Sequence, residues 1–465
     1  MDVLVFGTGR IYQRYKKYLS SVNVCAFLDN SVAKHNTVID GISVCAPSSV
    51  EEYKYDYIVI MCAAVDEVRQ QLLSLGASEY KIISYRDFGP FCSKSGYIED
   101  TPPAVEEFLY QSKNKKVVLF SHDMGLAGAP VVLFYLAQIL KHHDYDVLVY
   151  AGGHGALEDR FIALGIPVVV DDEWFYFEKR INTMGWVERF DLVVVNTVVL
   201  AYLLSDMRHH VPVLWWIHEE KGEYYTPSVV SSLQCCNSEN IHVHAVSPAA
   251  AKNFAELGHK DYLPKLLMYG IPDAVEYHHN TDNGEAFVFV IVGDVIERKN
   301  QLLAVQAVQL LNKSSDITRE IRLDIIGDYS SPYGQKVYDY AKDIPNIKFW
   351  GRIPHEEVIE YYANIDVLLC PSSVDPMPVV VTEALMLKKP VIISEAIGQA
   401  AFLKDGESCF MLEAFDTKSL ADKMEEALSD GNLERYGQAG REIYEAFFSF
   451  EKFENNVLEI VESIL

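Results

Sequence analysis

Two carboxylates, Asp375 and Glu383, stand with seven residues between them in the segment DPMPVVVTEALMLKKPVIIS, residues 375–394. The segment predicts a loop, a short helix and a buried strand, because Pro390 cannot continue a helix and the apolar run VIIS follows it. The free N–H groups at the start of that helix, around residues 379–381, are suited to a phosphate. A carboxylate on either side of that phosphate can accept hydrogen bonds from hydroxyls of a sugar or a ribose. The segment therefore predicts a nucleotide-sugar site.

A pair of cations precedes another predicted helix. The segment FVFVIVGD predicts a buried strand, and Arg298 and Lys299 lie in the turn between this strand and the apolar helix NQLLAVQAVQLL. Two cations in such a turn are suited to a diphosphate, because they add mobile positive charge to the fixed N–H groups of a helix end. A solvated turn that binds nothing is the alternative interpretation.

Further candidates lie in the glycine loop SHDMGLAGAP and after the strand VPVLWWI. Small residues such as Gly128 and Ala129 let the backbone approach a ligand. Ligands of open parallel sheets bind beyond the carboxyl ends of the strands, so we expect His218 and Glu219 to point into a cleft there. A single histidine at a strand end is often structural, so a chemical role for His218 is one of two interpretations.

Composition narrows the class of protein. With 465 residues the chain is too long for one core and predicts about three domains. The formal charge of −26 argues against a nucleic-acid partner, whose phosphates would be repelled. The sequence has no apolar run of the roughly 18 residues that a membrane span needs, and it starts with a strand pattern in place of a signal peptide. The eight cysteines form no C-x-x-C pair, so we expect reduced thiols in a cytoplasmic protein without a membrane span.

Alternating strand and helix patterns indicate an α/β protein with parallel sheets. We predict a Rossmann-like accessory domain over residues 1–92, a linker with one short helix over 93–115, a second domain over 116–275, a third domain over 285–446 and a C-terminal helix over 447–465.

The accessory domain carries part of a dinucleotide-binding fingerprint. Its first strand ends in the turn Gly7-Thr8-Gly9, and Asp29 ends the second strand, where a ribose-binding acid would lie. Tyr12 takes the place of the third glycine, which normally permits close packing of helix on strand. We therefore expect a smaller ligand or a protein contact in place of a full dinucleotide. A proline-containing linker follows, so we expect this unit to fold independently.

Residues 375–394 resemble the signature of the large retaining glycosyltransferase family numbered four. The resemblance continues in FVFVIVGDVIERKNQ, IDVLLCPSS and SEAIGQAAFLKDGESCF, and WIHE matches the position of a family histidine near the transferred sugar. The family has the GT-B fold, so the resemblance implies two Rossmann-like domains facing across a cleft, an acceptor domain at 116–275 and a donor-binding domain at 285–446, with the C-terminal helix crossing back onto the acceptor domain. The chain departs from the family pattern at Asp375, usually Glu, and at Asp294, often Arg.

The resemblance also implies roles for individual residues. His218 would lie near the reacting centre, Asp375 would contact the donor sugar and Glu383 would hold the ribose hydroxyls. The other donor-site candidates contact phosphate or nucleobase or let the backbone approach them: Gly128, Ala129, Gly293, Arg298, Lys299, Arg352, Ile353, Met377, Pro378, Val379 and Val380. Neither a metal nor another cofactor is implied, because GT-B enzymes generally work without a metal.

The implied function is that of a retaining glycosyltransferase of the hexosyltransferase type. It would move a sugar from a nucleoside-diphosphate sugar to a glycan, or to a lipid- or protein-linked glycan, in the synthesis of cell-surface polysaccharide or glycoconjugate. One alternative is a non-catalytic, sugar-nucleotide-binding subunit of a transferase complex, which the departures at Asp294 and Asp375 allow. Another is an epimerase or phosphorylase with the same frame. Peripheral attachment at the inner membrane face, and self-association or a partner contact through residues 1–92, stay open.

Overall fold

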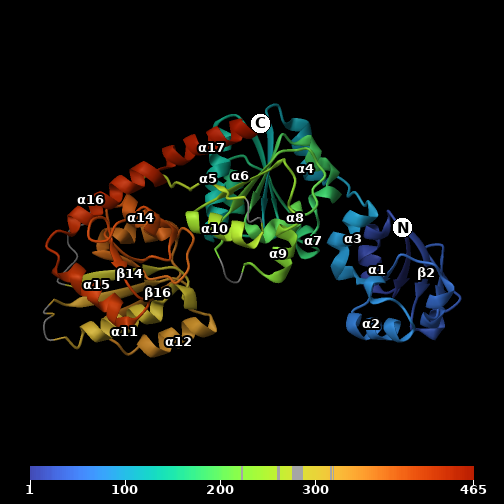
Figure 1. Cartoon of the computed structure of the whole chain (residues 1–465), viewed down its shortest axis with the longest axis horizontal. Coiled ribbons are helices and arrows are strands. Elements are labelled where there is room, and N and C mark those ends of the chain that lie inside the picture. Colours follow the sequence, from blue (N-terminus) through green and yellow to red (C-terminus); the bar gives the residue numbers. More distant parts are fainter. Residues whose placement is uncertain (221–223, 259–261, 275–285, 315–316, 318) are drawn as a thin grey trace.

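The computed structural model describes residues 1–220, 224–258, 262–274, 286–314, 317 and 319–465, and within these residues it contains three sheets. Figure 1 shows the three bodies as an arch, with the N-terminal domain in blue, the second domain in teal and green, and the third in yellow to red. The predicted α/β class with parallel sheets is confirmed. The polar stretch expected between the second and third domains, residues 277–285, lies outside the described residues.

The first sheet has the strand order β3-β4-β2-β1-β5-β6. The elements of this domain are β1 (Asp2–Phe6), α1 (Arg10–Tyr15), β2 (Asn23–Leu28), β3 (Val38–Ile39), β4 (Ile42–Cys45), β5 (Tyr57–Ile60), α2 (Val65–Ser74), β6 (Ile82–Ser84) and α3 (Phe88–Ser95). The sequence predicted four parallel strands and missed β3 and β4, which pair antiparallel at the sheet edge. Asp40 and Gly41 join them with φ values of +49° and +82°, and an Asp-Gly pair is what a two-residue hairpin turn of this kind favours.

The second sheet is parallel throughout, with the order β13-β12-β11-β10-β7-β8-β9. Its strands are β7 (Lys116–Ser121), β8 (Asp146–Ala151), β9 (Val168–Val170), β10 (Leu192–Asn196), β11 (Val213–Ile217), β12 (Ile241–Ala245) and β13 (Lys265–Leu266). Its helices are α5 (Gly128–His142), α6 (Glu158–Ala163), α7 (Asp172–Tyr176), α8 (Ala201–Leu204), α9 (Pro227–Leu233) and α10 (Pro248–Leu257). The predicted linker contains α4 (Pro103–Gln111), whose Val105 is buried in the core of this domain.

The third sheet is also parallel, with the order β16-β15-β14-β17-β18-β19. Its strands are β14 (Phe287–Val292), β15 (Ile321–Ile326), β16 (Ile347–Gly351), β17 (Val367–Cys370), β18 (Val391–Ser394) and β19 (Phe410–Leu412). The helices are α11 (Gln301–Leu311), α12 (Pro332–Ala341), α13 (His355–Tyr361), α14 (Val379–Met386), α15 (Thr417–Ser429), α16 (Leu433–Ile443) and α17 (Phe450–Ile464). Central strands such as β14 and β17 are apolar without alternation because helices cover both faces of the sheet.

Two chain crossings connect the second and third domains. Ile271, in the forward crossing, forms an isolated parallel bridge with Ser449 in the return crossing. Gly270 permits this approach, since a Cβ there would lie 2.2 Å from the carbonyl oxygen of Ser449. After the return, α17 lies along the second domain (Figure 1) and contacts α5, and Phe453 stacks on Trp216 with ring centroids 5.6 Å apart. Across the described parts of the chain, no helix is both long and apolar enough to cross a membrane.

The first domain shares its core with the second. Phe177, which follows α7 of the second domain, is 1% exposed and packs among Tyr15, Tyr18 and Phe88 of the first domain, at centroid distances of 5.1, 5.5 and 5.7 Å. The expectation of an independently folding unit stays a prediction. Its aromatic core contains a side chain that the first 92 residues do not supply.

Candidate active site

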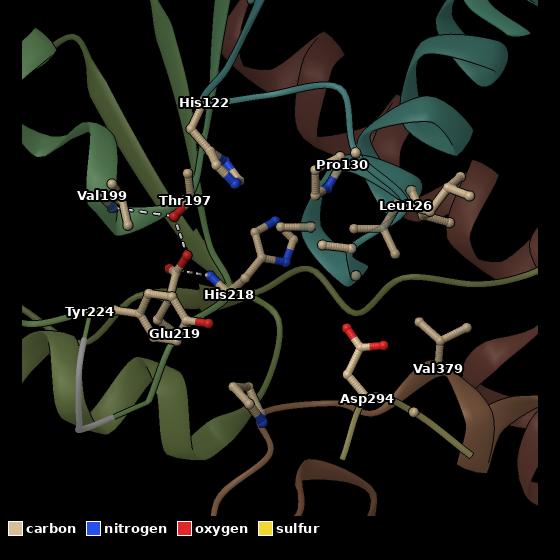
Figure 2. A pocket seen from close by; sticks show the side chains of 18 of the residues that line it. His122, Leu126, Pro130, Thr197, Val199, His218, Glu219, Tyr224, Asp294 and Val379 are labelled. Carbon is tan, nitrogen blue, oxygen red and sulfur yellow. Dashed lines mark hydrogen bonds between the residues drawn. The ribbon is translucent and has the colours of Figure 1, made fainter. Parts of the chain in front are cut away.

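A cavity of about 2210 Å³ opens between the second and third domains at the carboxyl ends of their strands. Figure 2 shows His122 and His218 of the second domain on one side of it and Asp294 and Val379 of the third on the other. Every residue predicted for the donor site and the reacting centre lines this one cavity, whereas Gly7, Gly9 and Asp29 of the accessory domain do not. The lining residues among these predictions are Gly128, Ala129, His218, Gly293, Arg298, Lys299, Arg352, Ile353, Asp375, Met377, Pro378, Val379, Val380 and Glu383. The topology thus brings together groups that lie up to 255 residues apart in the sequence.

Helix α14 points its N-terminus into this cavity. It begins at Val379 with Pro378 as its N-cap residue, and no side chain caps it. The N–H of Val381 donates to the carbonyl of Pro378 at 3.1 Å, so the expectation of three free N–H groups is corrected to two, those of Val379 and Val380. Two unpaired N–H groups at a helix N-terminus still form an anion site.

Arg298 and Asp375 form an ion pair at the edge of the donor-side wall. Arg298 Nη1 lies 2.9 Å from Asp375 Oδ2 and also donates to the carbonyl of Val374 at 3.2 Å. Asp375 is 8% exposed, so the pair is largely withdrawn from water. The buried Nε of Arg298 has no partner among the described residues. The sequence assigned these two residues to different parts of a donor, whereas the structure joins them to each other.

Lys299 and Arg352 differ in whether a carboxylate pairs with their positive charge. The ammonium of Lys299 lies over Gly293, whose φ is +128° and whose Cβ, if it had one, would be 2.2 Å from Lys299 Nζ. The φ of Gly293 is the feature that favours a glycine at this position, because the end of the lysine side chain could move away from a Cβ. Lys299 forms no ion pair with the described carboxylates, whereas Arg352 is 3.2 Å from both oxygens of Asp294. The acid in the position where the family often has arginine is thus paired with Arg352.

Glu383 lies one turn inside α14 and is 3% exposed. His355 Nε2 lies 2.6 Å from one of its carboxylate oxygens and the Tyr362 hydroxyl 3.3 Å from the other. The hydrogen bond with Glu383 raises the pKa of His355. His355, at the start of α13 in the segment RIPHEE, was not found from the sequence, because nothing local indicates that it faces a carboxylate 28 residues away.

His218 is held as a neutral imidazole. Asn196 donates its amide N–H to the carbonyl of Ala129 at 3.0 Å, which leaves its Oδ1 to accept from His218 Nε2 at 2.6 Å. Burial, with a smaller contribution from His122, lowers the pKa of His218 to about 3. With the proton fixed on Nε2, Nδ1 keeps its lone pair and can accept a hydrogen bond from a hydroxyl.

Glu219 supports the site from behind. Its carboxylate accepts from the Thr197 hydroxyl and from the N–H groups of Val198 and His218, at 2.9 and 3.1 Å for the two amides. Thr197 has a φ of +97°, a strained conformation for a β-branched residue that neighbouring contacts must maintain. The expectation that Glu219 points into the cleft is thus corrected, because its oxygens are engaged in holding the end of β10 (Figure 2).

Glu220, the next residue, is a cavity group that the sequence did not reveal. It lines the cavity, and its buried Oε1 has no hydrogen-bond partner. Burial, together with the negative charge of Asp375, raises the pKa of Glu220 to about 7. The doubled acid in WIHEE was the available signal, but only the fold separates the inward Glu219 from the outward Glu220. No group of three or more His, Cys, Asp or Glu side chains suited to a metal occurs in the described part of the chain.

Three family descriptions match separate parts of the chain. "Glycosyl transferases group 1" matches residues 276–443, "Glycosyl-transferase family 4" matches residues 113–257, and "C2185-like, N-terminal" matches residues 1–83. The first two together account for about two thirds of the chain, and the third gives residues 1–83 a family of their own.

Each of two curated relatives matches only part of this chain. The capsular polysaccharide biosynthesis glycosyltransferase CapM of Staphylococcus aureus is 26% identical over 177 residues, which are 37% of this chain and 45% of CapM. The lipopolysaccharide core biosynthesis glycosyltransferase LpsE of Rhizobium meliloti is 24% identical over 225 residues, 47% of this chain and 63% of LpsE. The chain thus spans less than two thirds of either relative.

Solved structures match more of the chain at lower identity. Anabaena HepE, solved with UDP and glucose, superposes with a TM-score of 0.63 at 16% identity, over 75% of this chain and all of HepE. WaaG, a glycosyltransferase involved in lipopolysaccharide biosynthesis, superposes with a TM-score of 0.55 at 15% identity, over 73% of this chain and 98% of WaaG. These neighbours have the GT-B fold, so the predicted GT-B architecture is confirmed.

Proposed function

This chain belongs to glycosyltransferase family 4, and from that premise we propose that it transfers a sugar from a nucleoside-diphosphate sugar to a carbohydrate acceptor. The observation that carries the proposal is the convergence of anion-binding and hydroxyl-binding groups on one wall of the cavity. Lys299, Arg298 and the N-terminus of α14 are suited to a diphosphate, and Glu383 lies one turn further into the same helix.

The rate-limiting difficulty of such a transfer is the departure of an anionic diphosphate from an oxocarbenium-like sugar. Positive groups that are fixed before reaction stabilise the developing charge without reorganisation. Asp375 holds the Arg298 guanidinium in place at 2.9 Å, and we assign Arg298 and Lys299 to the leaving diphosphate. The role of Asp375 is then to position Arg298, and contact with the donor sugar is secondary.

On the acceptor side we assign His218 to a hydroxyl of the transferred sugar. A neutral imidazole with its proton fixed toward Asn196 offers the Nδ1 lone pair to a hydroxyl donor. It adds no positive charge that would compete with the cations for the diphosphate. Glu220 completes this wall as a carboxyl group that titrates near neutral pH.

We further propose a UDP-sugar as donor, retention of configuration at the anomeric carbon, and an acceptor belonging to a cell-surface polysaccharide or glycoconjugate. HepE, a structural neighbour, was solved with UDP-glucose, and CapM and LpsE carry names from capsule and lipopolysaccharide synthesis. We propose that the reaction takes place in the cytoplasm and requires no metal.

The test begins with a panel of nucleotide sugars and the thermal unfolding of the full chain. A donor at about 100-fold its Kd should stabilise the protein by about 2.7 kcal/mol. Turnover of that donor with and without EDTA, and NMR of the anomeric configuration of the product, test the metal and the stereochemistry. Glu383→Ala should weaken donor binding by about 2 to 4 kcal/mol, because an acceptor for ribose hydroxyls is lost; unchanged donor affinity in a folded variant would refute that role.

The same experiment separates the rival function of a non-catalytic binding subunit. Both residues at which the chain departs from the family pattern form ion pairs, Asp375 with Arg298 and Asp294 with Arg352. These ion pairs are compatible with an active enzyme and with a binding subunit, so the measurement of turnover decides. Stabilisation by a donor without hydrolysis or transfer would identify a binding subunit. Turnover at rates of about 1 per second or more, the lower end of the range for typical enzymes, supports the transferase.

A further inference from the structure

The cavity is larger than a donor requires. Pockets for small ligands typically measure about 300 to 1,000 Å³, and this one measures about 2210 Å³. Beyond the donor-side wall and His218 it continues along α7 and α9 and reaches the first domain. Its far end, which we call the distal arm, is lined by Arg14, Tyr15, Glu173, Tyr176, Glu178 and Tyr202.

The first domain fixes the shape of the distal arm. Phe177 is buried in the core of that domain, and its two neighbours, Tyr176 and Glu178, line the cavity. Gly89 of α3 lies so close to this turn that a Cβ would be 2.2 Å from the carbonyl oxygens of Phe177 and Glu178. Glu178 has a φ of +51°, a conformation that needs such support in a non-glycine residue. Contacts with the accessory domain thus fix the conformation of a turn that lines the cavity.

Among the described residues, the distal arm contains one buried polar group without a partner, and one exposed carboxylate lies in the same arm. The Tyr202 hydroxyl is buried without a hydrogen bond, in a side chain that is only 7% exposed. The side chain of Glu178 is exposed, and its carboxylate forms no hydrogen bond or ion pair with the described residues. Burial, and after it the negative charge of Glu178, raises the pKa of Tyr202. A buried hydroxyl without a partner costs stability unless something else satisfies it. A ligand that both donates and accepts hydrogen bonds would satisfy the Tyr202 hydroxyl and would replace water at the Glu178 carboxylate.

The remaining lining defines the chemistry of that ligand. The Tyr176 ring is 59% exposed, and the Arg14 guanidinium lies 5.1 Å from the centroid of the Tyr15 ring. An exposed ring, a hydroxyl, a guanidinium and carboxylates are suited to the apolar faces and the many hydroxyls of sugars. The Glu173 carboxylate is paired with Lys17 at 2.6 Å, which leaves the Glu178 carboxylate to disfavour a phosphate or a polyanion, whose charge it would repel.

We propose that the distal arm is a subsite for the acceptor glycan, built jointly by the second domain and the accessory domain. The proposal rests on the transferase function and names where the acceptor chain extends from the reacting sugar. It also gives the accessory domain a task, namely to hold the turn that carries Tyr176 and Glu178.

The test uses oligosaccharides of one to eight sugars released from the surface polysaccharide of the source cell, and calorimetry on the full chain without donor. We expect affinity to rise with chain length. Glu178→Gln should weaken binding of the longest fraction about tenfold and Tyr202→Phe about fivefold, as for charged and neutral hydrogen bonds. Glu79→Gln and Tyr80→Phe are matched controls on the exposed surface of the accessory domain, where Tyr80 is 92% exposed.

A second readout distinguishes binding from structure. Tyr202→Phe removes a hydroxyl that has no partner in the folded protein, so the melting temperature should stay the same or rise while glycan affinity falls. Donor-induced stabilisation should be the same in wild type and all four variants, because none lies at the donor wall. The proposal is overturned if the wild type binds no fraction, or if Glu178→Gln and Tyr202→Phe bind as the controls do. If no donor stabilises the wild type, the transferase function is refuted. The glycan-binding measurement is made without donor, so it gives a separate result for the subsite.

Discussion

The Arg298–Asp375 ion pair predicts strongly non-additive substitutions. At a separation of 2.9 Å the Coulomb attraction is about 6 kcal/mol for an effective dielectric constant of about 20. Desolvation of both groups offsets most of it, so we expect a net coupling of about 1 to 3 kcal/mol. The two single variants should also differ from each other, because the side chain of Arg298 is 33% exposed and that of Asp375 only 12%.

Arg298→Ala leaves a carboxylate that water reaches poorly, and it should destabilise the third domain by about 2 to 4 kcal/mol. Asp375→Ala leaves a guanidinium that can be rehydrated and that keeps its bond to Val374, so about 1 to 2 kcal/mol is expected. In the double variant no buried charge remains without a partner. Its cost should therefore fall below the sum of the two single costs by the coupling energy.

The assay is urea unfolding of the wild type, the two single variants and the double variant. UDP should shift the unfolding transition of the donor-binding domain to higher urea concentration, and the four proteins are compared at that transition. The exposed pair Lys404 and Glu407, with side chains 73% and 61% exposed, provides a control cycle that should give less than about 1 kcal/mol. Single effects at Arg298 and Asp375 that add within about 0.5 kcal/mol would refute the reasoning, because additivity indicates independent sites.

Three further predictions concern two titrating groups of the site and the packing between the first and second domains. Because the pKa of Glu220 is raised to about 7, its protonated form stabilises the fold below the ordinary carboxyl pKa, and this stabilisation is lost as the pH rises through about 7. Glu220→Gln should therefore flatten the dependence of the melting temperature on pH between about 5 and 8, and an unchanged slope would contradict the raised pKa. The raised pKa of His355 beside Glu383 likewise contributes stability below the ordinary histidine pKa of about 6.5 that is lost at higher pH, so His355→Gln should lose more stability at pH 6 than at pH 8 in urea titrations. Phe177→Ala should cost about 3 to 5 kcal/mol of packing between the first two domains and give the first domain its own calorimetric transition, while donor binding stays intact; a single unchanged transition would argue against the shared core.

The sequence determined the elements of this protein because their signals are local. The apolar run of β14, the helix start at Pro378 and the strand after Pro390 each depend on the conformational limits of a few consecutive residues. The position of a residue at the carboxyl end of a parallel strand then fixes which edge of the sheet it occupies. For that reason all the residues predicted for the donor site and the reacting centre line one cavity.

Local signals failed where the backbone left its usual conformations or where two acids followed each other. The antiparallel edge of the first sheet was missed although Asp40-Gly41 is a hairpin signal, because β3 is only two residues long. Glu219 and Glu220 are equivalent by type and position, yet Glu219 accepts a hydrogen bond from Thr197, whereas Glu220 lines the cavity and its Oε1 has no hydrogen-bond partner among the described residues. Nothing in a sequence pattern distinguishes two neighbouring carboxylates when one of them accepts a hydrogen bond from a residue 22 positions away.

Only the tertiary structure decided which charges pair and what the accessory domain contacts. Arg298 meets Asp375 across 77 residues and His355 meets Glu383 across 28, and Phe177 fills the core of a domain that precedes it in the chain. Electrostatic and packing energies depend on distance in space and on exclusion of water, and neither is encoded in the spacing of residues along the chain. The sequence therefore specified the chemical groups of the site, while the fold determined their partners, their protonation and the third domain that closes the cavity.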